Sequence, residues 1–532
     1  MFFRPSLCPK NLIKENKMKK NKKRARISEQ VLRFVSLGVI FVINFILFVM
    51  LVSYGAQYVW IYALLEVLSI VVTLVLLARN DNPTYKIAWV VVIMAFPIFG
   101  ICIYILFGMD TLKNADMLRL SRLEHKNAPR FEEKVYDAMR SQENSGDALS
   151  QARFLGNVAH ARAFERTETK YYPLGDLLFP DLLEDLKSAE KFIFLEYFII
   201  EEGIMWNSIL EILKEKVKNG VDVRVIYDDM GSMFTLKHRY PKVLRSYGIK
   251  CIAFRRVVPI LSSSFNNRDH RKICVVDGKV AYTGGINLAD EYINKKERFG
   301  HWLDCGIRLR GEAVSSFTSM FLSMWEYVTL KKQDISKFAA PEGFLDTVKS
   351  DGFLVPYSDS PCDEYQVGED AYLNMISQAK KYVYICTPYL AIGHQMISAL
   401  TRAARSGVDV RIMTPGIPDK PPVHSLSRSY YEPLVSAGVK IYEYQPGFLH
   451  SKTFVCDDCL AICGTINLDF RSFCLHHECA VWMYSSSAVL DIKESFLSNL
   501  DKCTEITRTW CKKTPLIKKG FRLFLRLFSP LL

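Results

Sequence analysis

The sequence has no cysteine framework, although 14 cysteines occur among its 532 residues. The cysteines are scattered, and a chain of this length can bury a core large enough to be stable without disulfides, so we expect free thiols. The C-x-x-C pair, Cys456 and Cys459, lacks the second pair that would complete a zinc site, and it brackets a predicted hairpin turn. We interpret it as two facing strand ends, with a zinc or redox role as the minor alternative.

A signal-peptide cleavage site is also missing, although long apolar stretches follow a basic tail. The tail, residues 1–30, contains ten Lys or Arg and two Glu, a composition that does not fold alone. Within residues 31–108, stretches at about 34–53, 59–78 and 87–107 each have the roughly 20 residues that cross a bilayer. The first is too long for a signal-peptide core, so we expect it to remain as an anchor. Three such stretches in succession argue against the alternative of buried core helices.

These stretches predict a multi-pass protein of the cell membrane. A basic N-terminus favours the cytoplasm, and three full spans would then place the rest of the chain outside. Basic residues after the third stretch favour the opposite side, and the short connector between the first two stretches also permits a re-entrant hairpin. The number of full spans and the side of the membrane therefore stay open.

Acidic residues are outnumbered, and the net charge is +13. Much of the excess lies in the first 33 and the last 25 residues. A nucleic-acid binder would more often carry its basic residues on the folded domain, so we expect anionic membrane lipids and no nucleic acid as partners. Residues 511–532 form a basic amphipathic tail, in which a helix would place Phe521, Leu525 and Phe528 on one face. A helix in the membrane plane and a helix packed on the domain's own surface fit this pattern equally.

The chain after residue 166 contains one pattern twice. Residues 189–199 match 379–390, residues 219–226 match 406–413, and residues 247–254 match 437–444, at offsets of 187 to 190 residues. This is a duplicated β-α-β unit, and it predicts an α/β fold. We expect two tandem sheet domains, at 167–330 and 351–510, related by a pseudo-twofold axis and preceded by the transmembrane helical region. Residues 109–166 and 331–350 would be linkers.

Each copy also contains a His-x-Lys-x4-Asp motif followed by an Asn. The members are His270, Lys272, Asp277 and Asn287 in the first copy, and His450, Lys452, Asp457 and Asn467 in the second. A single motif would be a weak signal, because a chance His on a strand is more often structural. Two copies at matched spacing inside a duplicated unit are hard to obtain by chance.

The spacing indicates how each motif is arranged. Residues i and i+2 of a strand point to one face, so the His and the Lys of each motif share a face. The Asp ends an apolar run at a hairpin turn, and the returning strand brings small residues before the Asn. These are Gly285 in one copy, and Gly464 and Thr465 in the other. Glycine would let the backbone approach a phosphate, and Asn would supply an uncharged donor.

Two facing copies would surround one phosphate with a set that suits phosphodiester exchange, without a metal or another cofactor. One neutral imidazole can attack phosphorus, and the other, protonated, can give its proton to the departing alcohol. Lysine and asparagine would stabilise the charge on the phosphoryl oxygens. We count Asp277 and Asp457 among the catalytic residues, although turn formation explains their position equally well. His476, His477 and Glu478 do not predict a metal site, because neighbours on a strand point to opposite faces.

The paired motifs resemble the HKD motifs of the phospholipase D superfamily, over about residues 167–510. Residues 82–108, the segment GGINLADEY at 284–292 and the ending RLFSPLL are similar to bacterial cardiolipin synthases. The resemblance implies two phospholipase D-like α/β sheet domains with the active site between them. It also implies phosphatidyl transfer between two phosphatidylglycerol molecules, giving cardiolipin and glycerol. The departure from the family pattern is the extra apolar stretch at 34–53.

By the same resemblance, His270 would be the nucleophile and His450 the general acid. The family places an acid some 30 residues past each His to orient its ring, and Asp304 and Glu478 stand at that distance. A hydrolytic phospholipase D is an alternative, because water can attack the same phosphohistidine. A non-catalytic membrane scaffold is another, although both motifs are intact. The sequence does not indicate an oligomeric state.

Overall fold

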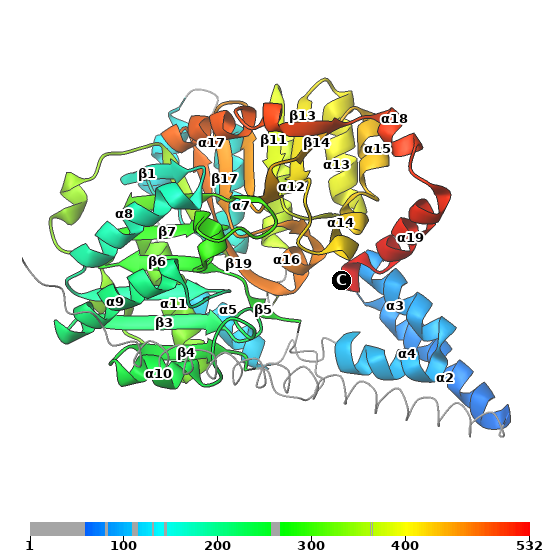
Figure 1. Cartoon of the computed structure of the whole chain (residues 1–532), viewed down its shortest axis with the longest axis horizontal. Coiled ribbons are helices and arrows are strands. Elements are labelled where there is room, and N and C mark those ends of the chain that lie inside the picture. Colours follow the sequence, from blue (N-terminus) through cyan, green and yellow to red (C-terminus); the bar gives the residue numbers. More distant parts are fainter. Residues whose placement is uncertain are drawn as a thin grey trace, which may run out of the picture.

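The computed structural model describes residues 59–79, 83–108, 115–129, 132–142, 146–256, 266–361, 363 and 365–531. The basic tail and the apolar stretch at 34–53 lie outside these residues. Figure 1 shows two sheets that lie side by side, with helices around them and a helical arm near the C-terminus.

The first half of the fold is a seven-stranded mixed sheet. Its spatial order is β1 (Thr167–Tyr172), β9 (Gly306–Gly311), β7 (Val280–Gly284), β6 (Lys272–Val276), β2 (Phe192–Tyr197), β3 (Asp222–Asp228) and β4 (Lys250–Phe254). Strands β2, β3 and β4 are parallel, and the others are antiparallel. The outer face packs on α8 (Gly175–Ser188), α9 (Ile204–Lys218) and α10 (Tyr240–Ser246). Every residue of β2 is buried, which explains its continuous apolar run.

The second half repeats this order. Its strands are β10 (Phe353–Asp359), β19 (His476–Tyr484), β17 (Leu460–Gly464), β16 (Thr453–Cys456), β11 (Tyr382–Cys386), β13 (Asp409–Pro415) and β14 (Lys440–Tyr444), followed by an extra edge strand, β20 (Cys503–Ile506). The outer face packs on α12 (Val367–Gln378), α13 (His394–Arg405), α14 (Pro421–Ser427) and α15 (Tyr431–Ala437). Seven equivalent strands in one order confirm the predicted duplication.

The two sheets share one core. Helix α11 (Val314–Thr329) and helix α17 (Ser487–Leu497) join inner-face residues of both sheets in a single buried cluster. Two short parallel strand pairs also cross between the halves. Strand β5 (Arg268–Asp269) pairs with the start of β19, and β8 (His301–Leu303) pairs with β15 (Gly447–Leu449). The halves are therefore joined both by apolar packing and by backbone hydrogen bonds.

The segment 109–166, which we expected to be a linker, contains three helices among its described residues. These are α5 (Ala115–Asn127), α6 (Glu133–Arg140) and α7 (Gly146–Val158). Apolar side chains of α6 and α7, including Tyr136, Met139 and Leu155, are buried in the core of the second half. The segment is therefore part of the folded body, because its helices have an apolar face that must be covered.

The arm consists of α2 (Val59–Ala78), α3 (Pro83–Ala95), α4 (Pro97–Ile103) and a π-helical turn at Tyr104–Gly108. The prediction of one helix across 87–107 is wrong. Phe96 leaves the helical conformation with φ −137° and ψ 77°, as is common for a residue before proline, and Pro97 begins a new helix. Gly100 lies against the backbone of α3, where a Cβ atom would come within 2.5 Å of the Val92 carbonyl oxygen. Across the described part of the chain, no helix has both the length and the apolar character needed to span a membrane.

The C-terminal helix α19 (Leu516–Leu527) lies beside the arm (Figure 1). Its Leu525 is buried against the second half, whereas Leu516, Ile517, Leu523 and Phe524 are exposed. Helix α19 therefore packs on the surface of the domain, as one of the two alternatives for the tail expected. A second apolar face of the same helix stays uncovered.

Gly447 tests the crossed strand pairs. A Cβ atom on Gly447 would lie 2.1 Å from the His301 carbonyl oxygen and 2.3 Å from its amide nitrogen, so Gly447→Ala must push β15 away from β8. We expect a loss of about 1–3 kcal/mol in the free energy of unfolding, measured by denaturant titration of the detergent-solubilised protein. Gly146→Ala is the control, because nothing lies within 4 Å of that position. Equal stability of the two variants would contradict the close contact.

Candidate active site

Each motif histidine lies where a crossed strand pair meets a sheet. His270 follows β5 and precedes β6, and its amide donates to the His477 carbonyl at 2.9 Å. His450 follows β15 and precedes β16, and its amide donates to the Leu303 carbonyl at 2.7 Å. Each histidine backbone is therefore held by the other half of the molecule.

The carboxylates pair with the imidazoles crosswise. Nδ1 of His270 lies 2.9 Å from both carboxylate oxygens of Glu478, and Nδ1 of His450 lies 2.6 Å from Oδ2 of Asp304. Both acids are completely buried. The expectation that each acid orients the histidine that precedes it in sequence is therefore wrong, because each acid serves the histidine of the other copy.

The strand register explains the exchange. In the pair β15–β8, Leu449 lies opposite Leu303, so the residues that follow, His450 and Asp304, become neighbours. In the pair β5–β19, Asp269 lies opposite His477, so His270 and Glu478 become neighbours in the same way. Sequence spacing fixes the distance along the chain, but only the pairing between halves decides which ring an acid can reach.

The small residues after each motif make room for these acids rather than for a phosphate. A Cβ atom on Gly285 would come within 1.9 Å of a carboxylate oxygen of Asp304, so glycine is required there. At the equivalent position, the hydroxyl of Thr465 donates to Oε2 of Glu478. Gly464 lies against Ala480 of the neighbouring strand. The amide of Gly285 donates to the Cys305 carbonyl and the amide of Thr465 donates to the Cys479 carbonyl, both at 2.9 Å, so the predicted phosphate contact through this backbone is not supported.

The motif lysines are buried and fold back onto their own histidines. Nζ of Lys272 donates to the His270 carbonyl at 2.6 Å, and Nζ of Lys452 donates to the His450 carbonyl. Each lysine is only 1% exposed. Burial lowers the pKa of Lys272 to about 7 and the pKa of Lys452 to about 8, although neighbouring carboxylates act in the opposite direction.

The two motifs share one electrostatic environment. Burial holds the pKa of His270 well below its ordinary value, and the charges of Lys272 and, from the other motif, Lys452 lower it further. Burial and the same two lysines also hold the pKa of His450 well below its ordinary value. Both imidazoles are therefore neutral near pH 7 in the free protein. A neutral imidazole has the lone pair that attack on phosphorus requires.

Asp277 and Asp457 lie at the far end of the motif hairpins. Asp277 accepts hydrogen bonds of 2.8 Å from the amides of residues 190, 191 and 192, and Asp457 accepts bonds of 2.6 to 2.9 Å from those of residues 380, 381 and 382. Both have positive φ, 51° and 53°, as hairpin turns require. Each Asp follows its motif lysine by five residues, which corresponds to about 17 Å along a strand. This separation excludes a direct catalytic role for Asp277 and Asp457. These residues fix the turn to the start of β2 or β11.

The motif asparagines are buried, and Asn287 is linked to a motif histidine through Tyr292. Asn287 accepts from the Ile199 amide at 3.0 Å and donates to the Tyr292 hydroxyl at 2.8 Å. The Tyr292 ring lies 5.6 Å from the His450 ring, which places Asn287 close to the second motif as well. Asn467, the equivalent residue, is 4% exposed.

His476 is a site residue that the sequence interpretation set aside. The prediction that His476 and His477 face opposite ways is confirmed, because His477 contacts Ser360 whereas the His476 ring lies 5.3 Å from the His270 ring. The signal was present in the sequence: His476 and Glu478 are two residues apart on one strand and share a face. Their common partner, His270, comes from the other half and could not be read from the local pattern.

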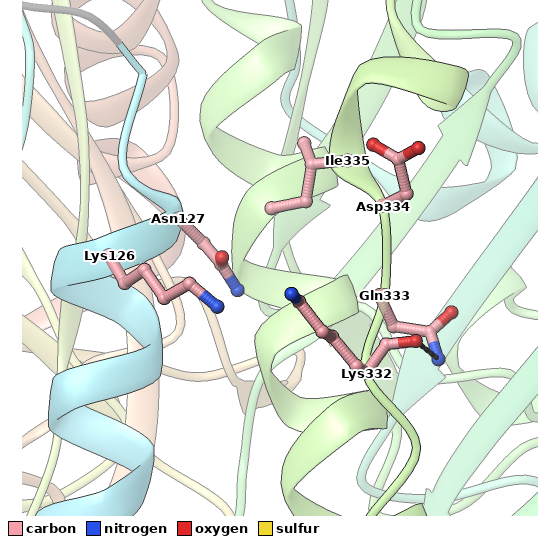
Figure 2. Close-up of a pocket in the computed structure, with 6 residues that line it drawn as sticks. All are labelled: Lys126, Asn127, Lys332, Gln333, Asp334 and Ile335. Atoms are coloured by element: carbon pink, nitrogen blue, oxygen red, sulfur yellow. Dashed lines mark hydrogen bonds between the residues drawn. The ribbon is translucent and has the colours of Figure 1, made fainter.

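A separate pocket lies between the end of α5 and the segment after α11. Figure 2 shows its lining residues, Lys126, Asn127 and Lys332 to Ile335. The volume of this pocket is about 490 Å³. None of the paired motif residues contributes to it, so it is not part of the site described above.

The crossed pairing predicts which mutations are coupled. The double variant Glu478→Gln, His270→Asn should show a coupling free energy of unfolding of about 1 kcal/mol or more, because the two residues form one buried hydrogen-bonded pair. Glu478→Gln combined with His450→Asn should show a smaller coupling, because the hydrogen-bond partner of the His450 ring is Asp304. Denaturant titration measures both cycles without requiring activity. Coupling of Glu478 to His450 instead of His270 would contradict the crossed arrangement.

Known proteins resemble the chain over most of its length. A family model described as cardiolipin synthase, PLD-like domain, matches residues 182–325 and 372–500, and a phospholipase D-nuclease N-terminal model matches 59–108. A protein of Streptococcus mutans described only as uncharacterized is 44% identical over 450 residues, covering 84% of this chain and 96% of that protein. A cardiolipin synthase of Alkalihalophilus pseudofirmus is 34% identical over 490 residues, covering 90% and 96%.

The fold also matches a solved structure. The crystal structure of phosphatidylserine synthase from Haemophilus influenzae superposes with a TM-score of 0.51 at 15% identity, covering 72% of this chain and 97% of that one. This likeness shows the two-domain fold, and the sequence matches show the family. The chain belongs to the cardiolipin synthase family within the phospholipase D superfamily.

Proposed function

We propose that the chain is a phosphatidyltransferase that joins two phosphatidylglycerol molecules into cardiolipin and releases glycerol. The observation that carries this proposal is the pair of buried imidazole–carboxylate couples, each completed by the other half, with a buried lysine beside each. This set can form and break a phosphorus–nitrogen bond. Membership of the family supports the choice of lipid.

In the first step, Nε2 of His270 attacks the phosphorus of one phosphatidylglycerol. A phosphorus–nitrogen bond forms, the bond from phosphorus to the glycerol oxygen breaks, and His450 gives a proton to the departing glycerol. Glu478 accepts from Nδ1 of His270, so the Nε2 lone pair faces the substrate and the positive charge that develops on the ring is stabilised. The choice of His270 as nucleophile follows the resemblance of its motif to the family's first motif.

In the second step, the neutral His450 removes a proton from the hydroxyl of a second phosphatidylglycerol. The resulting oxygen attacks the phosphohistidine, and the phosphorus–nitrogen bond breaks to give cardiolipin. Asp304 holds Nδ1 of His450 and stabilises the ring when it carries a proton. In the free protein the pKa of His450 is low, so the negative phosphate must raise it when substrate binds.

Lys272 and Lys452 supply positive charge for the non-bridging phosphate oxygens, and Asn287 and Asn467 supply uncharged donors nearby. A lysine held in a water-excluded position stabilises growing charge more strongly than one in solvent. The substrate itself favours the charged form of each lysine, because a phosphate beside an amine raises the pKa of that amine.

We propose that the arm and α19 place this site at the surface of the cell membrane. Large apolar side chains of α2 and α19 are exposed, among them Leu64, Val75, Leu516, Ile517 and Leu523. Lysines and arginines alternate with them on α19, an arrangement suited to anionic lipid headgroups. A multi-pass anchorage would add the apolar stretch at 34–53. A site at the bilayer surface favours transfer over hydrolysis, because acceptor lipid is concentrated there.

Purified protein incubated with labelled phosphatidylglycerol tests the reaction. We expect labelled cardiolipin and free glycerol, and a loss of about 10³-fold in rate for both His270→Asn and His450→Asn, since each ring takes part in both steps. His238→Asn is the matched control, because His238 is exposed on a loop. Phosphatidic acid as the sole product would move the assignment to a hydrolase, and no labelled product at all would leave a scaffold. Unchanged rates in both variants would show that the paired histidines do not carry the reaction.

The pKa of Lys452 predicts that the activity falls at alkaline pH. Burial lowers this pKa to about 8, against the opposing effect of Asp304, Glu478 and Asp469, so the free protein loses the charge of Lys452 as pH rises through 8. We expect kcat/KM to fall first above about pH 7, where Lys272 loses its charge, and to fall further above about pH 8, where Lys452 loses its own. We expect kcat to fall only at higher pH, because bound phosphate retains both protons.

The control for this pH dependence is Lys452→Arg, which keeps its charge throughout the range. Lys272 is present in both proteins, so the difference between the two pH profiles reports Lys452 alone. Identical profiles above about pH 8 in the two proteins would show that the charge of Lys452 does not affect the rate.

A further inference from the structure

We propose that His270, His476 and Glu478 form a binding site for Zn²⁺ or a similar divalent transition metal, and that occupation of this site inhibits transfer. One ligand atom from each residue lies within 4.8 Å of the other two. The inhibitory effect rests on the proposed function, whereas metal binding does not.

The fold brings the three side chains to one point. His476 and Glu478 share a face of β19, and the β5–β19 pairing delivers His270 to the same face. Nδ1 of His270 lies 2.9 Å from Glu478, and Nδ1 of His476 lies 3.6 Å from the same carboxylate oxygen. The ligand atoms of a tetrahedral zinc site are on the order of 3.3 Å apart, so small side-chain rotations would complete the geometry.

His476 has an unused donor atom at this point. Nδ1 of His476 is buried and has no hydrogen-bond partner within the ranges that the structure describes. A buried polar atom without a partner costs about 1–3 kcal/mol, so such an atom in a native site calls for a ligand.

Two imidazoles and one carboxylate are the ligand set that zinc accepts when a fourth position stays open. Hard cations such as Mg²⁺ prefer oxygen ligands and should not bind. Lys272 carries positive charge near the site and opposes a cation. Burial also raises the pKa of Glu478 well above its ordinary value, so part of the binding free energy is spent on keeping this ligand ionised. We therefore expect affinity in the micromolar range rather than the nanomolar range of a structural zinc site.

Coordination would inhibit through the ring proton. In the active arrangement, Nδ1 of His270 carries the ring proton and donates a hydrogen bond to Glu478. The Nε2 lone pair is then free to attack phosphorus. A metal on Nδ1 requires that lone pair, so the proton of the neutral ring moves to Nε2. Nε2 then has no lone pair with which to attack phosphorus. Binding therefore forms the metal–ligand bonds and moves one ring proton, and it breaks no other covalent bond.

The pseudo-twofold axis gives an internal comparison. The residue two positions before Asp304 is Trp302, which is equivalent to His476, two positions before Glu478. The Trp302 ring lies 5.8 Å from the His450 ring and offers no lone pair to a metal. The site is therefore confined to one motif, and the His450–Asp304 couple serves as its matched control.

The first experiment measures binding. Zn²⁺ is titrated into the purified full-length protein in detergent, in competition with a chromogenic zinc indicator. We expect one equivalent of zinc to bind with micromolar affinity, and we expect His476→Asn and His270→Asn to weaken this binding at least tenfold. His450→Asn, which is inactive if the proposed function holds, should bind as the unaltered chain does, and so should His477→Asn, one residue away on the opposite face. Mg²⁺ should not compete.

The second experiment measures inhibition, with each protein referred to its own zinc-free rate of cardiolipin formation. The midpoint of inhibition should coincide with the dissociation constant and should rise at least tenfold in His476→Asn. Unchanged affinity in both His476→Asn and His270→Asn overturns the site, and weakened binding in His450→Asn moves it to the other motif. A protein that binds zinc as expected but makes no cardiolipin refutes the proposed function and retains the metal site.

Discussion

The structure depends on two short parallel strand pairs that cross between its halves. Strands β5 with β19 and β15 with β8 contain few hydrogen bonds, yet their register decides which carboxylate meets which imidazole. If either pair slipped by one residue, the acid would turn to the opposite face and its histidine would lose its partner. The shared apolar core between the sheets holds this register, since it prevents the halves from sliding. The apolar packing between the sheets therefore determines which acid contacts each catalytic histidine.

The second constraint is electrostatic. Four positively chargeable side chains and two acids lie together with almost no exposure to water. Burial keeps both imidazoles neutral and weakens the hold of both lysines on their protons, so the free protein carries less charge at this point than its side chains suggest. A phosphate reverses these shifts, because an anion in a low-dielectric environment favours every cationic form around it. Substrate itself completes the charge state that the reaction uses.

The sequence predicted which residues form the site better than it predicted which acid pairs with which histidine. The duplication, the paired motifs and the α/β sheets follow from repeated apolar strands and matched spacing, and the structure has them. The exchange of Asp304 and Glu478 between copies does not follow, because it arises from strand pairing that brings together residues 146 and 208 positions apart. Spacing also misplaced Asp277 and Asp457, which fit the motif by position but act on backbone amides.

The arm shows a similar limit. Composition marks residues 87–107 as one apolar stretch, and a hydropathy average does not register the break at Phe96. The residue before a proline is the local signal for that break, and it carries little weight beside a long apolar run. The helices of 109–166 are also hard to predict, because each has only a short apolar face among many polar and charged residues.

The crossed acids also bear on how the chain arose. A single copy of the unit would hold a histidine without its own carboxylate and a carboxylate without its own histidine. Such a unit would acquire two complete couples only by meeting a second copy of itself about a twofold axis. The exchange is therefore what a symmetric homodimer would leave behind after gene duplication and fusion, and divergence since then has put a tryptophan beside one imidazole and a histidine beside the other.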